Sequence, residues 1–171
     1  MLSEIDKTCI DIIGVFENGK PGVYGHLVAV SGDAGGLSGG LLMASMNSGN
    51  LGKLMRAYSD AGGMQISEEE IQQTEAMDPS QNTDRTIREM FAQAAKDPIM
   101  QEVQDDFFYE EFLIPAYNWC AKRNFVEPLT RCVAFDGIVH GKFYGAKGFA
   151  TTTPGTLPER AWVSEYLRRR R

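Results

Sequence analysis

Several features that the sequence lacks argue against broad classes of protein. Its three cysteines, Cys9, Cys120 and Cys132, are too few and too scattered for a disulfide framework or a zinc site. No apolar run approaches the roughly 20 residues that span a membrane, and the polar, acidic N-terminus does not resemble a signal peptide. Basic residues number 17 against 23 acidic ones, which disfavours a nucleic-acid surface but permits an acidic cleft for a cationic polymer. We therefore expect a soluble protein with buried free thiols.

The length of 171 residues fits one domain, residues 1–171, which we expect to have two lobes. Apolar residues recur at helical spacing over most of the chain, which predicts a mainly α fold. Ser3 and Asp6 resemble the start of the first helix, and Gly19 and Pro21 end it. The expected inward stripe of this helix is Leu2, Ile5, Cys9, Ile12, Ile13 and Phe16.

A small β element is expected to interrupt the helices. Residues 23–30 are rich in β-branched and aromatic side chains, which predicts an extended segment. Residues 31–40 carry five glycines and are expected to form a loop. Residues 41–43 are predicted to lead back into helix. The helix that follows Ser48-Gly49-Asn50 has an expected inward face of Leu51, Leu54, Met55 and Tyr58.

The second half of the chain is more strongly helical. Capping boxes and proline starts predict helices that begin near Ser67, Asp97, Glu127 and Thr156. Pro115 is expected to kink or break one of them. The inward positions of the last two helices are Leu129, Cys132, Val133, Asp136 and His140, followed by Trp162, Val163, Tyr166 and Leu167.

Two carboxylates near the N-terminus have contrasting surroundings. Glu17 lies beside the apolar face in the last turn of the first helix, where the helix dipole and partial desolvation favour its protonated form. Asp33 lies among glycines in a polar loop and is expected to stay ionised. Two oppositely tuned carboxyl groups are the usual arrangement of a general acid and a general base. The pair therefore predicts a hydrolase that protonates a leaving oxygen and activates water.

The glycine-rich loop also permits a second interpretation. Residues 36–40 match the G-x-S-x-G nucleophile elbow around Ser38, and Asp136 and His140 follow in the chain order of α/β-hydrolases. An elbow requires a strand, a turn and a helix within a parallel sheet, and the chain shows no alternating βαβ pattern. A phosphate loop is weaker still, because no Gly-Lys-Ser/Thr closes the glycine run. A serine hydrolase remains the alternative to the paired-carboxylate enzyme.

Short motifs, in order along nearly the whole chain, carry a family resemblance. They are Phe16-Glu17-Asn18-Gly19, Tyr24-Gly25, the loop 32–40, Ser48-Gly49-Asn50, Asp97-Pro98, Gln104-Asp105, Pro115-Ala116, residues 135–141, Glu159-Arg160-Ala161-Trp162 and Tyr166-Leu167. Together they resemble the family 46 chitosanases and their relatives among phage lysins and secretion-system effectors. The resemblance implies a lysozyme-like α+β fold, in which two helical lobes and a small β element flank a substrate cleft.

The resemblance also implies catalytic roles. Glu17 matches the general acid of the family, and Asp33 matches the carboxylate that activates the attacking water. Ser38 takes the place of a threonine that helps to hold this water. Because the family inverts the anomeric centre, the two carboxyl groups are expected to lie about 6.5–9.5 Å apart. No cofactor is implied, since neither proton transfer needs a metal.

Further residues are implied to support catalysis or to bind substrate. Asp136 matches a buried acid that fixes the catalytic glutamate together with arginines, and Arg160 and Arg168 are candidate partners. His140 lies on the same helix face as Asp136 and belongs to the same candidate group. The candidate substrate-binding residues are Tyr24, His26, Asn47 and Asn50.

Two positions depart from the chitosan-cleaving members of the family. Asn50 stands where they usually have an aspartate that pairs with the free amine of the substrate, and Gly35 stands where they have an arginine. An amide cannot make the charged pair but can hydrogen-bond an N-acetyl group. We therefore expect peptidoglycan, cleaved as by a lysozyme or muramidase, before chitosan. The acidic net charge favours chitosan, because peptidoglycan is itself anionic.

Kinship also implies a route to the substrate. Lysins and effectors without a signal peptide are made in the cytoplasm and then released or delivered to the cell wall or periplasm. We expect an antibacterial enzyme of this kind, alone or within a larger phage or secretion-system protein. It is not expected to bind nucleic acid or insert into a membrane. Relatives continue past the last helix with another arginine, whereas this chain ends at Arg171, so a non-catalytic glycan-binding module is a further alternative.

Overall fold

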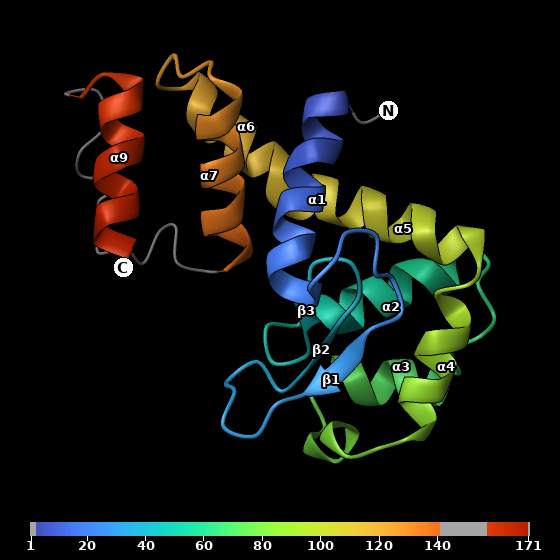
Figure 1. Cartoon of the computed structure of the whole chain (residues 1–171). Coiled ribbons are helices and arrows are strands. Elements are labelled where there is room, and N and C mark those ends of the chain that lie inside the picture. Colours follow the sequence, from blue (N-terminus) through green and yellow to red (C-terminus); the bar gives the residue numbers. More distant parts are fainter. Residues whose placement is uncertain (1–2, 141–156, 171) are drawn as a thin grey trace. The chain divides into compact units, whose positions relative to one another are not determined.

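The computed structural model describes residues 3–140 and 157–170 (Figure 1). They form two compact units. The first, the sheet unit, consists of residues 10–107, and the second, the terminal unit, consists of the described residues before and after that range. The chain is mainly helical with one small antiparallel sheet, which confirms the predicted fold class. Within the described residues, no helix is long and apolar enough to cross a membrane.

Helix α1 (Glu4–Asn18) begins where the sequence predicts. The Ser3 N–H donates to the Asp6 carboxylate at 2.8 Å, and the Asp6 N–H donates to Ser3 Oγ at 3.2 Å. This reciprocal pair satisfies two of the N–H groups that a helix start leaves without an intrahelical partner. An aspartate therefore serves here in the place that glutamate usually occupies in a capping box.

The buried face of α1 differs from the predicted one. Its members are Asp6, Cys9, Ile10, Ile13 and Gly14, whereas the predicted Ile5, Ile12 and Phe16 are exposed. Leu2 lies outside the described residues. Asp6 can enter the face because the Tyr117 hydroxyl donates a hydrogen bond to its carboxylate, which offsets the cost of burying an acid. A hydrophobicity pattern places every acid outward and does not foresee this.

The sheet has the order β1 (Leu27–Ala29), β2 (Leu37–Gly39) and β3 (Ala44–Ser45), all antiparallel. Ser38 lies in its middle and pairs with Val28 on one side and Ser45 on the other. Two expectations were wrong: residues 37–39 of the predicted loop are a strand, and residues 41–43 form a turn into β3 instead of a helix. The run around Leu41 is buried and apolar, and such short runs fit strand, turn or helix equally well.

The remaining elements of the sheet unit are helical. They are α2 (Asn50–Asp60), α3 (Glu68–Glu75), the 3₁₀ turn η1 (Pro79–Asn82), α4 (Thr86–Ala94) and α5 (Pro98–Phe108), whose last residue belongs to the terminal unit. α2 packs against α3 and β3, and α4 packs against β1. The inward face predicted for α2 is fully buried. Asp97 caps α5 as predicted, because its carboxylate accepts the Ile99 N–H at 3.0 Å.

The terminal unit is built from the first part of α1, up to Cys9, and from η2 (Tyr109–Leu113), α6 (Ile114–Ala121), α7 (Pro128–Val139) and α9 (Glu159–Arg170). α7 and α9 lie side by side (Figure 1). Trp162 of α9 is fully buried, and the centroid of its ring lies 4.7 Å from that of Trp119 on α6 and 5.1 Å from that of Tyr166. The chain stays helical through Pro115, but the α-helical pattern is interrupted directly before it by the π-helical segment η2, and Pro115 falls in the first turn of α6.

Several predictions for the terminal unit need adjustment. Leu129 and Leu167 are exposed, although both were placed inward. Thr156, the expected cap of the last helix, lies outside the described residues. Glu159 instead accepts the N–H groups of Val126 and Glu127 at 3.0 and 2.8 Å, and so caps the start of α7 from a neighbouring helix. All three cysteines are buried free thiols, as predicted.

Candidate active site

Glu17 lies half-buried in the last turn of α1, where the sequence places it. The next residue, Asn18, fixes this end of the helix. Its side-chain nitrogen donates to the carbonyl of Leu41 at 2.9 Å and lies 3.4 Å from that of Gly40. Its side-chain oxygen is 2.9 Å from Nδ1 of His26. The end of α1 is therefore tied to the residues that follow β2 and precede β1.

Asp33 occupies the exposed loop between β1 and β2. Its carboxylate accepts the Gly35 N–H at 3.1 Å, and its own N–H donates to the carbonyl of Val30 at 3.0 Å. Such local bonds stabilise tight turns at aspartate. The carboxylate of Asp33 is thus held by its own turn and faces solvent, which is the environment that the sequence predicts for a general base.

Asp33 and Ser38 converge on Gly35. A Cβ atom at Gly35 would lie 3.4 Å from Oδ2 of Asp33 and 3.3 Å from Oγ of Ser38. Ser38 is 7% exposed, and its hydroxyl lies 3.3 Å from the carbonyl of Gly36. A carboxylate and a hydroxyl that face one small space are suited to bind a shared water and to accept its proton. Gly35 stands where the resemblance expects an arginine, and a Cβ atom there would also lie 3.2 Å from Cβ of Ser45.

Asn47 has a structural role in this loop. Its side-chain nitrogen donates to the carbonyl of Ala34 at 2.8 Å, and its backbone N–H donates to the carbonyl of Gly35 at 3.0 Å. Asn47 thereby clamps the turn that carries Asp33. Asn50, the first residue of α2, is half-buried, and its N–H lies 3.3 Å from Oγ of Ser48. The sequence named both as substrate-binding residues without foreseeing the clamp.

Gln104 is a buried connector that sequence reasoning recognised only as part of a motif. Its side chain is fully buried, accepts the Leu41 N–H at 2.7 Å and donates to the carbonyl of Tyr24 at 3.0 Å. The backbone of Leu41 is therefore hydrogen-bonded to Asn18 through its carbonyl and to Gln104 through its N–H. The sequence did contain a signal for this role: Gln104 lies four positions after Met100, so both residues share one face of the helix, and that face is buried.

Tyr24 lies in an acidic environment. Its hydroxyl donates to the Asp105 carboxylate at 2.9 Å. Burial raises the pKa of Tyr24, and the negative charges of Asp105 and Asp11 raise it further. Burial also raises the pKa of Asp105, with Asp106 and Asp11 adding to the effect and the bond from Tyr24 opposing it. The carboxylates of Asp105 and Asp11 thus both act on this candidate substrate residue.

The other supporting candidates lie in the terminal unit. Asp136 is half-buried rather than buried, and its carboxylate lies 3.3 Å from Nδ1 of His140. The guanidinium of Arg160 lies 3.5 Å from the Glu127 carboxylate. Arg168 pairs with Glu165 at 2.6 Å. Their role in fixing Glu17 stays a prediction.

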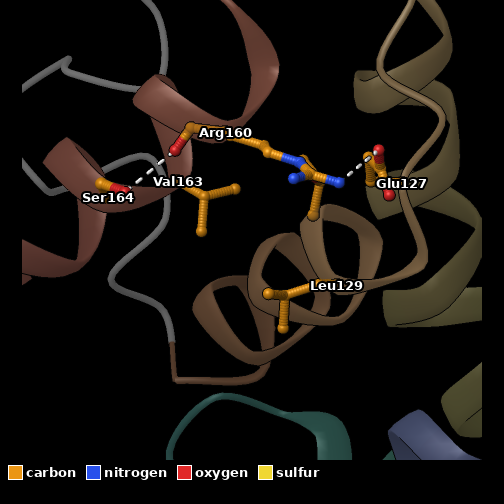
Figure 2. A pocket seen from close by; sticks show the side chains of 6 residues that line it. Glu127, Leu129, Arg160, Val163 and Ser164 are labelled. Atoms are coloured by element: carbon orange, nitrogen blue, oxygen red, sulfur yellow. Dashed lines mark hydrogen bonds and ion pairs between the residues drawn. The ribbon is translucent and has the colours of Figure 1, made fainter.

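A pocket of about 320 Å³ lies in the terminal unit (Figure 2). It is lined by Glu127, Leu129, Thr130, Arg160, Val163 and Ser164. The side chain of Arg160 extends toward Glu127 (Figure 2). Neither Glu17 nor Asp33 lines this pocket.

The structure also tests the serine-hydrolase interpretation and the possibility of a metal site. Ser38 lies within a strand of an antiparallel sheet, whereas a nucleophile elbow needs a sharp turn between a parallel strand and a helix. The serine-hydrolase alternative thus loses its structural basis. Among residues 3–140 and 157–170, no group of three or more His, Cys, Asp or Glu side chains is arranged to hold a metal ion.

The chain resembles solved structures more clearly than it resembles known sequences. No family model and no curated protein sequence matches the chain. A family 46 chitosanase of Gynuella sunshinyii, solved with chitotetraose, has 21% identity and a TM-score of 0.82 over 99% of this chain and 77% of that one. A native chitosanase from Bacillus subtilis MY002 has 15% identity and a TM-score of 0.84 over 99% and 77% of the two chains. The chain therefore has the fold of the family 46 chitosanases, as its motifs imply.

Proposed function

We propose that this chain is an endo-acting glycoside hydrolase that cleaves β-1,4 linkages of an amino-sugar polymer with inversion. The observation that carries the proposal is the convergence of the Asp33 carboxylate and the Ser38 hydroxyl on Gly35. Glu17 belongs to the same compact unit, where Asn18 fastens it to the turn after β2. The chitosanase fold supports the same class of reaction.

The reaction needs two carboxyl groups in opposite protonation states. Glu17 gives its proton to the glycosidic oxygen as the bond from that oxygen to the anomeric carbon breaks. A water held by Asp33 and Ser38 attacks the same carbon from the opposite face and loses its proton to Asp33. The products are two shorter glycans, and the proton gained by Asp33 replaces the one lost by Glu17. Separation of the two carboxyl groups by roughly 6.5–9.5 Å leaves room for this water.

For the substrate we propose peptidoglycan first. Asn50, half-buried at the start of α2, offers an amide that can donate to and accept from an N-acetyl group. An amide lacks the charge that would select a free ammonium group. This substrate implies action at the cell wall or periplasm, reached by release or within a phage or secretion-system protein.

Chitosan is the second candidate, and two observations favour it. The structural neighbours include a chitosanase in complex with chitotetraose. The carboxylates of Asp11, Asp105 and Asp106 act electrostatically around Tyr24 and its partner, which would attract a cationic glucosamine chain.

The test is digestion of purified peptidoglycan and chitosan side by side. We expect new reducing ends from one polymer, with mass spectrometry of the products identifying the bond, and an initial α-anomer from a β-linkage in proton NMR. Glu17→Gln and Asp33→Asn should each lower turnover about 10²–10⁴-fold while circular dichroism stays unchanged. Glu89→Gln, an exposed control on α4, should keep full turnover.

The possible outcomes separate the alternatives. Full activity of Glu17→Gln would reject the assigned acid. Binding of either glycan without release of reducing ends would favour a non-catalytic binding module.

A further inference from the structure

The imidazole of His26 is hydrogen-bonded to the residue that follows the candidate acid. His26 is exposed and directly precedes β1, and its Nδ1 lies 2.9 Å from Oδ1 of Asn18. The orientation of the Asn18 amide follows from its other partners, because its nitrogen lies 2.9 Å from the carbonyl oxygen of Leu41 and 3.4 Å from that of Gly40. A reversed amide would set its oxygen against both carbonyl oxygens. The oxygen of Asn18 therefore faces His26.

This orientation determines which nitrogen of His26 carries a proton. An amide oxygen can only accept a hydrogen bond, so Nδ1 of His26 must be the donor in its contact with Asn18. A neutral imidazole carries a single proton, which leaves Nε2 without one. The geometry thus specifies the Nδ1–H tautomer of His26.

Backbone contacts hold His26 in the same place. Its carbonyl oxygen accepts the Gly40 N–H at 2.8 Å, and the Gly40 carbonyl oxygen lies 3.4 Å from the amide nitrogen of Asn18. Together with the contact between Asn18 and Nδ1, these interactions form a closed ring of His26, Gly40 and Asn18. All three residues belong to the sheet unit, as does Glu17. Both the backbone and the side chain of His26 are therefore fixed relative to the end of α1.

We propose, on the basis of the proposed function, that His26 is a positioning residue for glycan cleavage. Its Nδ1–H holds the side chain of Asn18, and Asn18 fixes the last turn of α1, in which Glu17 lies. His26 acts on the reaction through Asn18 and needs no contact with the polymer for this role. Precise placement of a catalytic acid matters, since a displacement of about 1 Å can cost about 10²-fold in rate.

Two substitutions separate the positioning role from direct substrate binding. The amide nitrogen of asparagine is as many bonds from Cα as Nδ1 of histidine, whereas that of glutamine is as many bonds away as Nε2. His26→Asn should therefore keep the donor to Asn18 and the kcat and KM of wild type. His26→Gln should lower kcat about 10- to 100-fold with little change in KM. Met64→Gln, at a position that is 87% exposed, is the control and should change neither constant.

The tautomer is measured without reference to activity. The experiment records long-range proton–nitrogen NMR spectra of the full chain, labelled with nitrogen-15, at a pH where the imidazole is neutral. The chain has two histidines, so the signals that disappear in His26→Asn belong to His26. We expect Nδ1 of His26 to show the chemical shift of a protonated ring nitrogen and Nε2 that of an unprotonated one.

The kinetic constants are measured on peptidoglycan and on chitosan, with circular dichroism to confirm that each variant is folded. Wild-type kcat in His26→Gln would overturn the positioning role. A raised KM with unchanged kcat in His26→Asn would also overturn it and would assign His26 to substrate binding. Cleavage by a wild-type protein that holds the Nε2–H tautomer would overturn the role of His26 alone. Failure of the wild type to cleave either polymer would reject the proposed function, and the role of His26 with it.

Discussion

The side-chain nitrogen of Asn18 donates a hydrogen bond of 2.9 Å to the carbonyl of Leu41. Because Asn18 directly follows Glu17, this bond fixes the helix end that carries the candidate acid to the turn after β2, and β2 contains Ser38. Misplacement of a catalytic group by about 1 Å can cost about 10²-fold in rate. We therefore expect the side chain of Asn18 to position Glu17 for the proposed reaction.

We expect Asn18→Ala to lower kcat about 10- to 100-fold with little change in KM, because the acid loses its fixed position but the substrate contacts remain. Steady-state kinetics on the polymer that is cleaved would measure this. Asn118→Ala, at an exposed position of α6, is the matched control and should leave both constants unchanged. An unchanged kcat in Asn18→Ala would exclude the positioning role.

Gln104→Met tests the buried connector. Methionine keeps the approximate length of the side chain but leaves the Leu41 N–H and the Tyr24 carbonyl without their present partner. We expect the free energy of unfolding to fall by about 1–3 kcal/mol for each group. Urea unfolding followed by circular dichroism would give the value. Gln101→Met removes only one bond, to the carbonyl of Ala95 at 2.9 Å, and should cost less.

Asp105→Asn should make stability less sensitive to mild acid. Burial raises the pKa of Asp105, so the folded state holds this proton more tightly than the unfolded chain. The contribution to stability is present below the ordinary value of 3.8 and is lost as pH rises through the raised pKa. Asparagine still offers an oxygen to the Tyr24 hydroxyl. Urea unfolding should therefore show that the free energy of unfolding of the variant increases relative to that of wild type as pH rises through this window. A difference between the two proteins that does not change with pH would contradict the assignment.

Glu159→Gln should show the opposite dependence. Partial burial opposes ionisation, but the Thr130 hydroxyl and the N–H groups of Val126 and Glu127 hold the pKa of Glu159 below its ordinary 4.5. Its contribution is present above 4.5 and is lost as pH falls through the lowered pKa. At pH 7 we expect the variant to lose about 1 kcal/mol, as for a lost helix cap. Thermal melts from pH 7 to pH 3 should show the loss shrinking, and Glu102→Gln, exposed on α5, should show none.

Local features of the fold followed from the sequence. The pair Ser3 and Asp6 and the cap at Asp97 were predicted because each depends on partners within three residues. The two candidate carboxylates were also found in the predicted kinds of place, one in the last helical turn and one in an exposed turn. Such features are encoded by neighbours along the chain.

Features that depend on distant partners did not follow. Asp6 is buried because of Tyr117, 111 residues away. Gln104 reaches Leu41 across 63 residues, and Asn47 reaches Ala34 across 13. No periodicity within a short window encodes these pairs. The roles of connector and loop clamp therefore appeared only with the structure, and so did the strand that contains Ser38.

The pair Gly39 and Gly40 restricts how this scaffold can diversify. A side chain at Gly39 would place Cβ 2.4 Å from the carbonyl oxygen of His26, and one at Gly40 would place it 2.7 Å from Oε1 of Gln104. Gly40 also has a φ of +78°, which other residues rarely adopt. Mutant libraries that seek a new polymer preference should leave both glycines untouched and randomise the exposed positions Ser31 and Ala34. Selection would then change the side chains that the loop offers to a polymer and preserve the backbone that holds the loop in place.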